Sequence, residues 1–161
     1  MHLFSSVAIA GAIVAILAMP AAAEPPSKPA PASAHSTSTK THRVVIQVTQ
    51  NDPAVMNTAL NNAENLVNYY KDKGEKIEIE FVAYGPGLSM MRSDTSPVKE
   101  RLTAMAANMK NVTFTGCGNT LANQSKQEKK EISLVPEARV VPTGIAHIVE
   151  LEEQGWTYVR P

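Results

Sequence analysis

Cys117 is the residue best suited to chemistry, and it is the only cysteine among 161 residues. Residues 112–115 (Val-Thr-Phe-Thr) predict a short strand, and Gly116-Cys117-Gly118 predicts a turn into a helix. The N-terminus of a helix has free N–H groups and partial positive charge, and both favour a thiolate over a thiol. A lone cysteine is more often an inert, buried apolar side chain. Both interpretations stay open on the local pattern alone.

Four neighbours of Cys117 are candidates to support a reactive sulfur. Asn119 and Thr120 could donate hydrogen bonds to it, although capping the helix is the commoner role of such residues. Gly116 and Gly118 would leave the backbone around the sulfur accessible. The sequence therefore predicts a site built from one short segment, together with whatever other segments the fold brings to it.

The elements that must position this segment alternate between strands and helices. Glu78 and Glu80 lie on one face of the second strand and predict a place near the sheet edge. The last helix is expected to turn Ile145, Ile148, Val149 and Leu151 inward. The alternation predicts a three-layer α/β/α sandwich with a mainly parallel, five-stranded sheet. Strands are expected over residues 43–49, 77–83, 112–115, 138–141 and 156–159, and helices over 53–73, 97–110, 119–130 and 144–154.

In open parallel sheets the ligand site lies beyond the carboxyl ends of the strands. Three segments are therefore expected to meet residues 116–120 there. They are residues 49–52 with Asn51 and Asp52, residues 84–87 with Tyr84 and Gly85, and residues 142–144 with Thr143. Tyr84 could donate a hydrogen bond to a thiolate or persulfide, or it could only pack.

His147 lies about one turn into the last predicted helix. From there it could approach Cys117 as a base, but a solvent-facing or capping role is the commoner one for a single helical histidine. No metal or cofactor site is predicted, because the remaining histidines and the one cysteine lack ligand spacing. Gly85-Pro86-Gly87 lacks the pattern of a phosphate-binding loop. Fifteen basic and fifteen acidic residues cancel, so no basic surface predicts nucleic-acid binding.

The N-terminal residues predict export. Residues 3–17 are almost continuously apolar, and Ala21-Ala22-Ala23 predicts cleavage of a signal peptide, residues 1–23, after Ala23. The segment before the apolar run has no Lys or Arg, so an uncleaved membrane anchor remains the alternative. Residues 24–41 are rich in Pro, Ala, Ser and Thr and predict a disordered linker before one domain, residues 42–161. The expected location is periplasmic or secreted.

The chain resembles the DsrE/DsrF-like family of sulfur-relay proteins. The Tyr84-Gly85-Pro86-Gly87 and Cys117-Gly118-Asn119-Thr120 segments are the most specific part of this resemblance. The other similar stretches are residues 59–66, 140–145 and 155–161. The resemblance implies a flavodoxin-like fold and a homo-oligomer, often a trimer or hexamer. It also implies that Cys117 carries sulfane sulfur as a persulfide and passes it to a partner.

The leading prediction is a periplasmic sulfur carrier, similar to a sulfurtransferase, with Cys117 as the acceptor. With no second cysteine in the chain, the sulfur donor and acceptor must be other proteins or small thiols. Two alternatives remain open. One is a non-catalytic oligomeric module that binds a small ligand or a protein and in which Cys117 only packs. The other is a thiol redox sensor.

Overall fold

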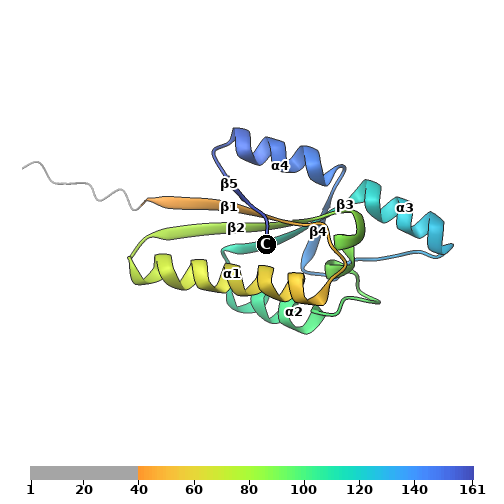
Figure 1. Ribbon diagram of the computed structural model, residues 1–161, viewed down its shortest axis with the longest axis horizontal. Coiled ribbons are helices and arrows are strands. Elements are labelled where there is room, and N and C mark those ends of the chain that lie inside the picture. Colours follow the sequence, from red (N-terminus) through yellow and green to blue (C-terminus); the bar gives the residue numbers. More distant parts are fainter. Residues whose placement is uncertain (1–39) are drawn as a thin grey trace, which may run out of the picture. The chain divides into compact units, whose positions relative to one another are not determined.

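A computed structural model describes residues 40–161 of the chain. The expected signal peptide, and the expected linker up to residue 39, lie outside the described residues. The described part begins with a strand and alternates strands with helices to its end (Figure 1). The elements are β1 (Thr41–Val48), α1 (Pro53–Asp72), β2 (Lys76–Ala83), the 3-10 helix η1 (Gly85–Met91), α2 (Lys99–Asn108), β3 (Val112–Cys117), α3 (Gly118–Glu128), β4 (Ala138–Val141), α4 (Gly144–Glu153) and β5 (Thr157–Val159).

The five strands form one sheet in the order β4-β3-β2-β1-β5, and every neighbouring pair is parallel. Figure 1 shows α1 and α2 on one face of this sheet and α4 on the other. The predicted three-layer sandwich is therefore confirmed, and its arrangement is flavodoxin-like. The chain steps from β1 to β4 in one direction and then returns to place β5 beside β1.

Local sequence explains the entry into the first crossover. The β-branched run of β1 is buried over its last five residues, as expected for a central strand. Asp52 then caps α1, because its carboxylate accepts a hydrogen bond from the Ala54 N–H (2.7 Å) and Pro53 takes the first helical position. Gly74, with a φ of +69°, follows the helix and turns the chain into β2.

The two faces of the sheet differ in size and polarity. The face under α1 and α2 holds the larger apolar core, including the stacked rings of Phe81 and Phe114, whose centroids lie 5.0 Å apart. The apolar cluster on the α4 face is much smaller and consists of Val45, Val82, Ile148 and Leu151, with Tyr84 and Trp156 packed beside it. The α4 face therefore leaves room for polar side chains within the sheet.

Two expectations about burial were wrong. β2 lies between β1 and β3 rather than near the edge, and Glu80 is only 3 % exposed because partners on three other elements satisfy its carboxylate. On α4, Ile148 and Leu151 are buried as predicted, whereas Ile145 and Val149 are 51 % and 48 % exposed. Only a narrow stripe of α4 contacts the sheet, so the apolar side chains at the margin of its apolar face stay exposed to solvent.

The strand ends bring the expected segments together. The Ser89 hydroxyl, in η1 after β2, donates to Asn51 Oδ1 after β1 (2.6 Å). Gly87 packs so closely on the end of β1 that a Cβ there would lie 2.3 Å from the Val48 carbonyl oxygen. The η1 helix, which the sequence did not predict, therefore lies directly against the carboxyl ends of the strands.

Candidate functional site

Cys117 is the last residue of β3 and also the N-cap of α3. Its backbone is extended, with φ −76° and ψ 117°, so the strand passes into the helix without an intervening loop. In the sheet it pairs with Val141, the last residue of β4, from which the chain continues through Pro142 and Thr143 into α4. The sulfur-bearing residue is thus placed where two helices begin.

Four hydrogen-bond donors surround the sulfur. Burial raises the pKa of the Cys117 thiol, but hydrogen bonds from the Thr120 hydroxyl and from the N–H groups of Gly144, Thr120 and Asn119 outweigh it. The pKa of Cys117 therefore lies below the ordinary value of a cysteine. Two of the N–H donors belong to the first turn of α3 and the third to the first residue of α4, so both helix dipoles favour the thiolate.

Gly144 closes the site from the side of α4. A Cβ at this position would lie 3.2 Å from Cys117 Cβ and 3.3 Å from Tyr84 Cδ1. Glycine thus lets the first turn of α4 approach the thiol and the tyrosine ring together. As a consequence Cys117 is only 5 % exposed, so little of its side chain is accessible to a reagent.

The predicted glycines before and after the cysteine serve packing. A Cβ at Gly116 would lie 2.4 Å from Leu134 Cδ1, and one at Gly118 would lie 3.1 Å from the Val141 carbonyl oxygen. Access around the sulfur, the role expected of both residues, stays a prediction. Both glycines allow β3, the start of α3 and the end of β4 to pack closely.

Thr120 is held in place by the turn after β2. Its Oγ1 accepts a hydrogen bond from the Gly85 N–H (3.1 Å), which leaves the hydroxyl proton for the sulfur. Gln124, one turn further along α3, donates to the Gly85 carbonyl oxygen (3.2 Å). Gly85 has a φ of +55°, a conformation that glycine adopts without strain. The Tyr-Gly-Pro-Gly turn therefore orients one of the donors of the site.

Tyr84 lies beside the cysteine, and its hydroxyl is hydrogen-bonded to a side chain on β1. The hydroxyl accepts a hydrogen bond from Gln47 on β1, and Gln47 Oε1 in turn accepts one from the Tyr158 hydroxyl on β5 (2.5 Å). Burial raises the pKa of Tyr84. The described geometry therefore gives Tyr84 a packing contact at the site, and hydrogen bonds link its phenol to Gln47 on β1 and, through it, to Tyr158 on β5.

The remaining predicted residues hold the surrounding segments. Asn119 Nδ2 donates to Thr143 Oγ1 (3.0 Å), and the Asn119 N–H also donates to the Pro142 carbonyl oxygen (3.1 Å), which joins the starts of α3 and α4. Asn51 and Asp52 are bonded to Ser89 and Ala54, so their side chains shape the loop after β1.

His147 is bonded to a carboxylate that the sequence analysis did not consider as part of the site. Its Nε2 lies 2.7 Å from Glu80 Oε1, and none of the donors to Cys117 described above comes from His147. The same oxygen of Glu80 accepts from Thr115 Oγ1 (2.6 Å) and from Arg139 Nη2 (2.7 Å). β2 also carries Lys76 and Glu78, which are exposed, and no signal in the sequence singles out Glu80 as the buried charge of this strand.

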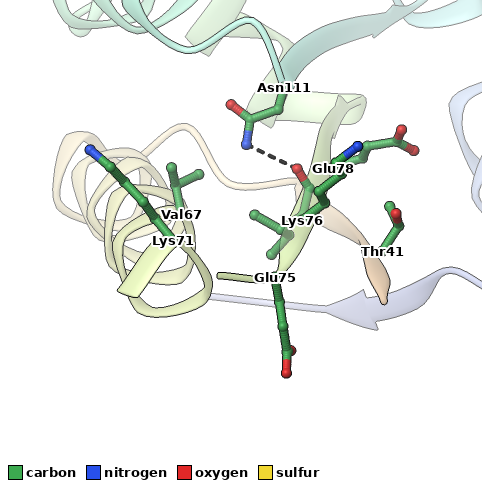
Figure 2. Close-up of a pocket in the computed structure, with 8 residues that line it drawn as sticks. Thr41, Val67, Lys71, Glu75, Lys76, Glu78 and Asn111 are labelled. Carbon is green, nitrogen blue, oxygen red and sulfur yellow. Dashed lines mark hydrogen bonds between the residues drawn. The ribbon is translucent and has the colours of Figure 1, made fainter. Parts of the chain in front are cut away.

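One hollow of the described chain lies away from Cys117, and a second borders the site. Figure 2 shows the one at the amino ends of β1 and β2, with a volume of about 580 Å³, lined by Thr41, Val67, Lys71, Glu75, Lys76, Ile77, Glu78 and Asn111. Asn111 Nδ2 donates to the Ile77 carbonyl oxygen there (2.9 Å), the bond that Figure 2 marks with a dashed line. A smaller hollow of about 200 Å³, between the end of β4 and α4, is lined by Thr143 and His147 and borders the site.

Residues 40–161 contain no group of three or more His, Cys, Asp or Glu side chains arranged to hold a metal ion. The helices of the same residues are all too short or too polar to cross a membrane.

Comparisons with known proteins support the fold. No protein-family model matches the chain, and no curated protein is similar to it. A solved structure from Methanobacterium thermoautotrophicum, a protein of unknown function called MTH1491, is 29 % identical with a TM-score of 0.63. The similarity covers 74 % of this chain and 99 % of that protein. The chain therefore shares its flavodoxin-like fold with a protein to which no function is attached.

Proposed function

We propose that this protein is a sulfur carrier of the DsrE/DsrF-like family, in which Cys117 accepts sulfane sulfur as a persulfide and passes it to a partner thiol. The observation that carries the proposal is the position of Cys117 at the starts of α3 and α4, where the Thr120 hydroxyl and three N–H groups lower the pKa of its thiol. A carrier needs a nucleophilic thiolate and needs neither a metal nor a general base. The Tyr-Gly-Pro-Gly turn adds support, since its Gly85 orients the Thr120 hydroxyl that faces the sulfur.

Loading is a thiol–disulfide type of exchange. The Cys117 thiolate attacks the outer sulfur of a donor persulfide, R–S–SH, and a new S–S bond forms as the bond in the donor breaks. The leaving thiolate R–S⁻ takes the electron pair, and the product is Cys117–S–SH. The sulfane sulfur keeps its oxidation state, so no external oxidant or reductant is required.

Unloading reverses the roles. A thiolate of the acceptor attacks the outer sulfur of Cys117–S–SH, becomes a persulfide itself and returns Cys117 as a thiolate. The donors around the sulfur stabilise this leaving thiolate, and a thiol of lower pKa leaves faster. The same four hydrogen bonds therefore assist both loading and unloading.

The burial of Cys117 restricts which sulfur donors and acceptors can react with it. With Cys117 only 5 % exposed, small persulfides and polysulfides can reach it more easily than bulky disulfides. A protein acceptor must bring its thiol to Cys117, at the starts of α3 and α4. The proposed carrier is periplasmic, in line with the apolar leader and Ala-Ala-Ala segment of the sequence, and its donor and acceptor are therefore exported proteins or small thiols.

A homo-oligomer, trimer or hexamer, is part of the proposal. The exposed apolar side chains Val140, Ile145 and Val149 lie on β4 and α4, the elements that follow each other next to Cys117. Contacts between copies would cover such residues. Light scattering on the mature protein measures this directly, and a monomer at working concentration would remove this part of the proposal.

The low exposure of Cys117 favours a second candidate function, a non-catalytic module that binds a small ligand or protein. In that case the thiol only packs between β3 and α4, and Cys117→Ala keeps ligand binding. A redox sensor would use the same thiolate but react with peroxide faster than with polysulfide.

Intact mass spectrometry of the mature protein, before and after treatment with polysulfide, tests the proposed function. We expect a mass gain of one sulfur atom that a reductant removes, with no gain in Cys117→Ser. A wild-type protein that gains no sulfur, or a Cys117→Ser protein that gains as much, would refute the carrier.

A further inference from the structure

The buried carboxylate of Glu80 is the most strongly bonded charge on the α4 face, and the carrier chemistry does not use it. Its Oε1 accepts from Thr115 Oγ1 (2.6 Å), Arg139 Nη2 (2.7 Å) and His147 Nε2 (2.7 Å). Burial raises the pKa of Glu80, but these three hydrogen bonds outweigh it and keep the pKa below its ordinary value. The carboxylate is therefore ionised at neutral pH.

The three partners of Glu80 come from the elements that build the Cys117 site. Thr115 precedes Cys117 by two residues on β3 and lies on the same face of the sheet. Arg139 lies two residues before Val141, and Val141 is the β4 residue that pairs with Cys117. His147 lies in the first turn of α4, and its N–H donates to the Thr143 carbonyl oxygen (3.0 Å).

Among the three hydrogen bonds of Glu80, the one from His147 connects it to the helical turn that contains Gly144, a donor to the Cys117 sulfur. His147 follows Gly144 by three residues in the same helical turn, and the Gly144 N–H donates to the Cys117 sulfur. Further along, α4 is held by Ile148 and Leu151 in the small apolar cluster. Its first turn has no side-chain cap from Thr143, and the bond between Glu80 and His147 ties that turn to the sheet, while Asn119 bonds to Thr143 just before it.

We propose that Glu80 is a positioning residue that holds the Gly144 N–H against the Cys117 sulfur by anchoring His147 and, with it, the first turn of α4. Arg139 and Thr115 keep the carboxylate in place on the sheet, and His147 transmits that position to the helix. The inference rests on the proposed function, because a positioned thiolate matters only if Cys117 reacts.

The test compares His147→Ala with His147→Gln. Alanine removes the bond to Glu80 without disfavouring the helix, whereas the glutamine amide nitrogen can reach the carboxylate as the imidazole Nε2 does. The readout is the pH titration of the single thiolate by its ultraviolet absorbance, with the signal of Cys117→Ser subtracted. This readout needs no sulfur donor, so its result is separate from the persulfide test of the proposed function.

At pH values below the pKa of Cys117, we expect His147→Ala to have a thiolate fraction about three- to tenfold lower than wild type. Loosening one of several hydrogen bonds to a thiolate would have an effect of this size. His147→Gln should stay within about twofold of wild type, since rescue needs a donor and not an imidazole. The proposal is overturned if both variants titrate as wild type, which would leave Glu80 a purely structural ion pair. It is also overturned if both are shifted equally, which would assign the effect to the imidazole itself.

Glu80→Gln provides a second measurement should His147→Ala not fold. Removing a negative charge near a thiolate lowers the pKa of the thiol through the field alone. Positioning predicts the opposite sign, because the neutral amide holds His147 less tightly than the carboxylate. Arg139, His147 and Glu150, whose Oε2 lies 3.7 Å from His147 Nδ1, are the other charged or titratable groups around this contact. A fall in the pKa of Cys117 in Glu80→Gln would contradict the proposal.

Discussion

Replacing Thr120 by valine should make the Cys117 thiol distinctly less acidic. Valine keeps the shape of threonine and removes the hydroxyl that donates to the sulfur. A hydrogen bond to a charged group contributes about 1.5–3 kcal/mol, and one pKa unit corresponds to about 1.4 kcal/mol. The N–H donors from Gly144, Thr120 and Asn119 remain and can tighten. We therefore expect the lower end of this range, a rise of about one pKa unit.

The expected rise in the pKa of Cys117 has a direct consequence for its reactivity. A raised pKa of Cys117 lowers the thiolate fraction at pH values below the pKa, so alkylation by iodoacetamide at neutral pH should slow about tenfold. The valine also leaves the Gly85 N–H without its acceptor. We expect this loss to reduce the free energy of unfolding by about 1 kcal/mol, measured in urea.

Thr120→Ser is the matched control, because serine keeps the hydroxyl that both donates to the sulfur and accepts from Gly85. It should titrate like the wild-type protein. If Thr120→Val folds and its thiolate titrates at the same pH as those of wild type and Thr120→Ser, the Thr120 hydroxyl does not stabilise the thiolate, and the description of the site is wrong.

Three further substitutions test two close packing contacts and one ion pair of the fold. Gly144→Ala should raise the pKa of Cys117, because the added Cβ would lie 3.2 Å from Cys117 Cβ and push the first turn of α4 away; thiolate absorbance measures it. Gly87→Ala should destabilise the fold by about 3 kcal/mol or more in urea unfolding, since the new Cβ would lie 2.3 Å from the Val48 carbonyl oxygen. Arg92→Met should lower the urea midpoint at neutral pH, and the difference from wild type should shrink as pH falls. Arg92, together with Lys130, lowers the pKa of Glu128 to about 2, so the contribution of Arg92 is present above the usual carboxyl pKa and lost as pH falls toward 2.

The fold could be predicted from the sequence because its signals are local. Asp52-Pro53, Gly74 and the β-branched run of β1 mark element ends and a buried strand by residue type alone. The alternation of strands and helices then leaves few topologies for a parallel sheet. The order of the strands was not predicted, because nothing in the sequence of β2 says which strands flank it.

The site could be predicted only in part, for a physical reason. Cys117 at a strand-to-helix turn is a local pattern, and the structure places it at the starts of two helices. Glu80 was interpreted as an edge residue, because a charge in a strand normally faces water. Its partners Thr115, Arg139 and His147 are distant in sequence, and only the folded chain brings them to one oxygen. Similarly, the apolar stripe of α4 did not reveal how narrowly the helix rests on the sheet.

A complete cycle of loading and discharge tests the central claim most directly. The mature protein is loaded with polysulfide, freed of excess reagent and mixed with a small acceptor thiol, and both masses are followed by mass spectrometry. We expect the protein to lose one sulfur atom as the acceptor gains one, with Cys117→Ser inactive in both steps. Sulfur that never loads, or that stays on Cys117 while the acceptor remains unchanged, would contradict the assignment of this chain as a sulfur carrier.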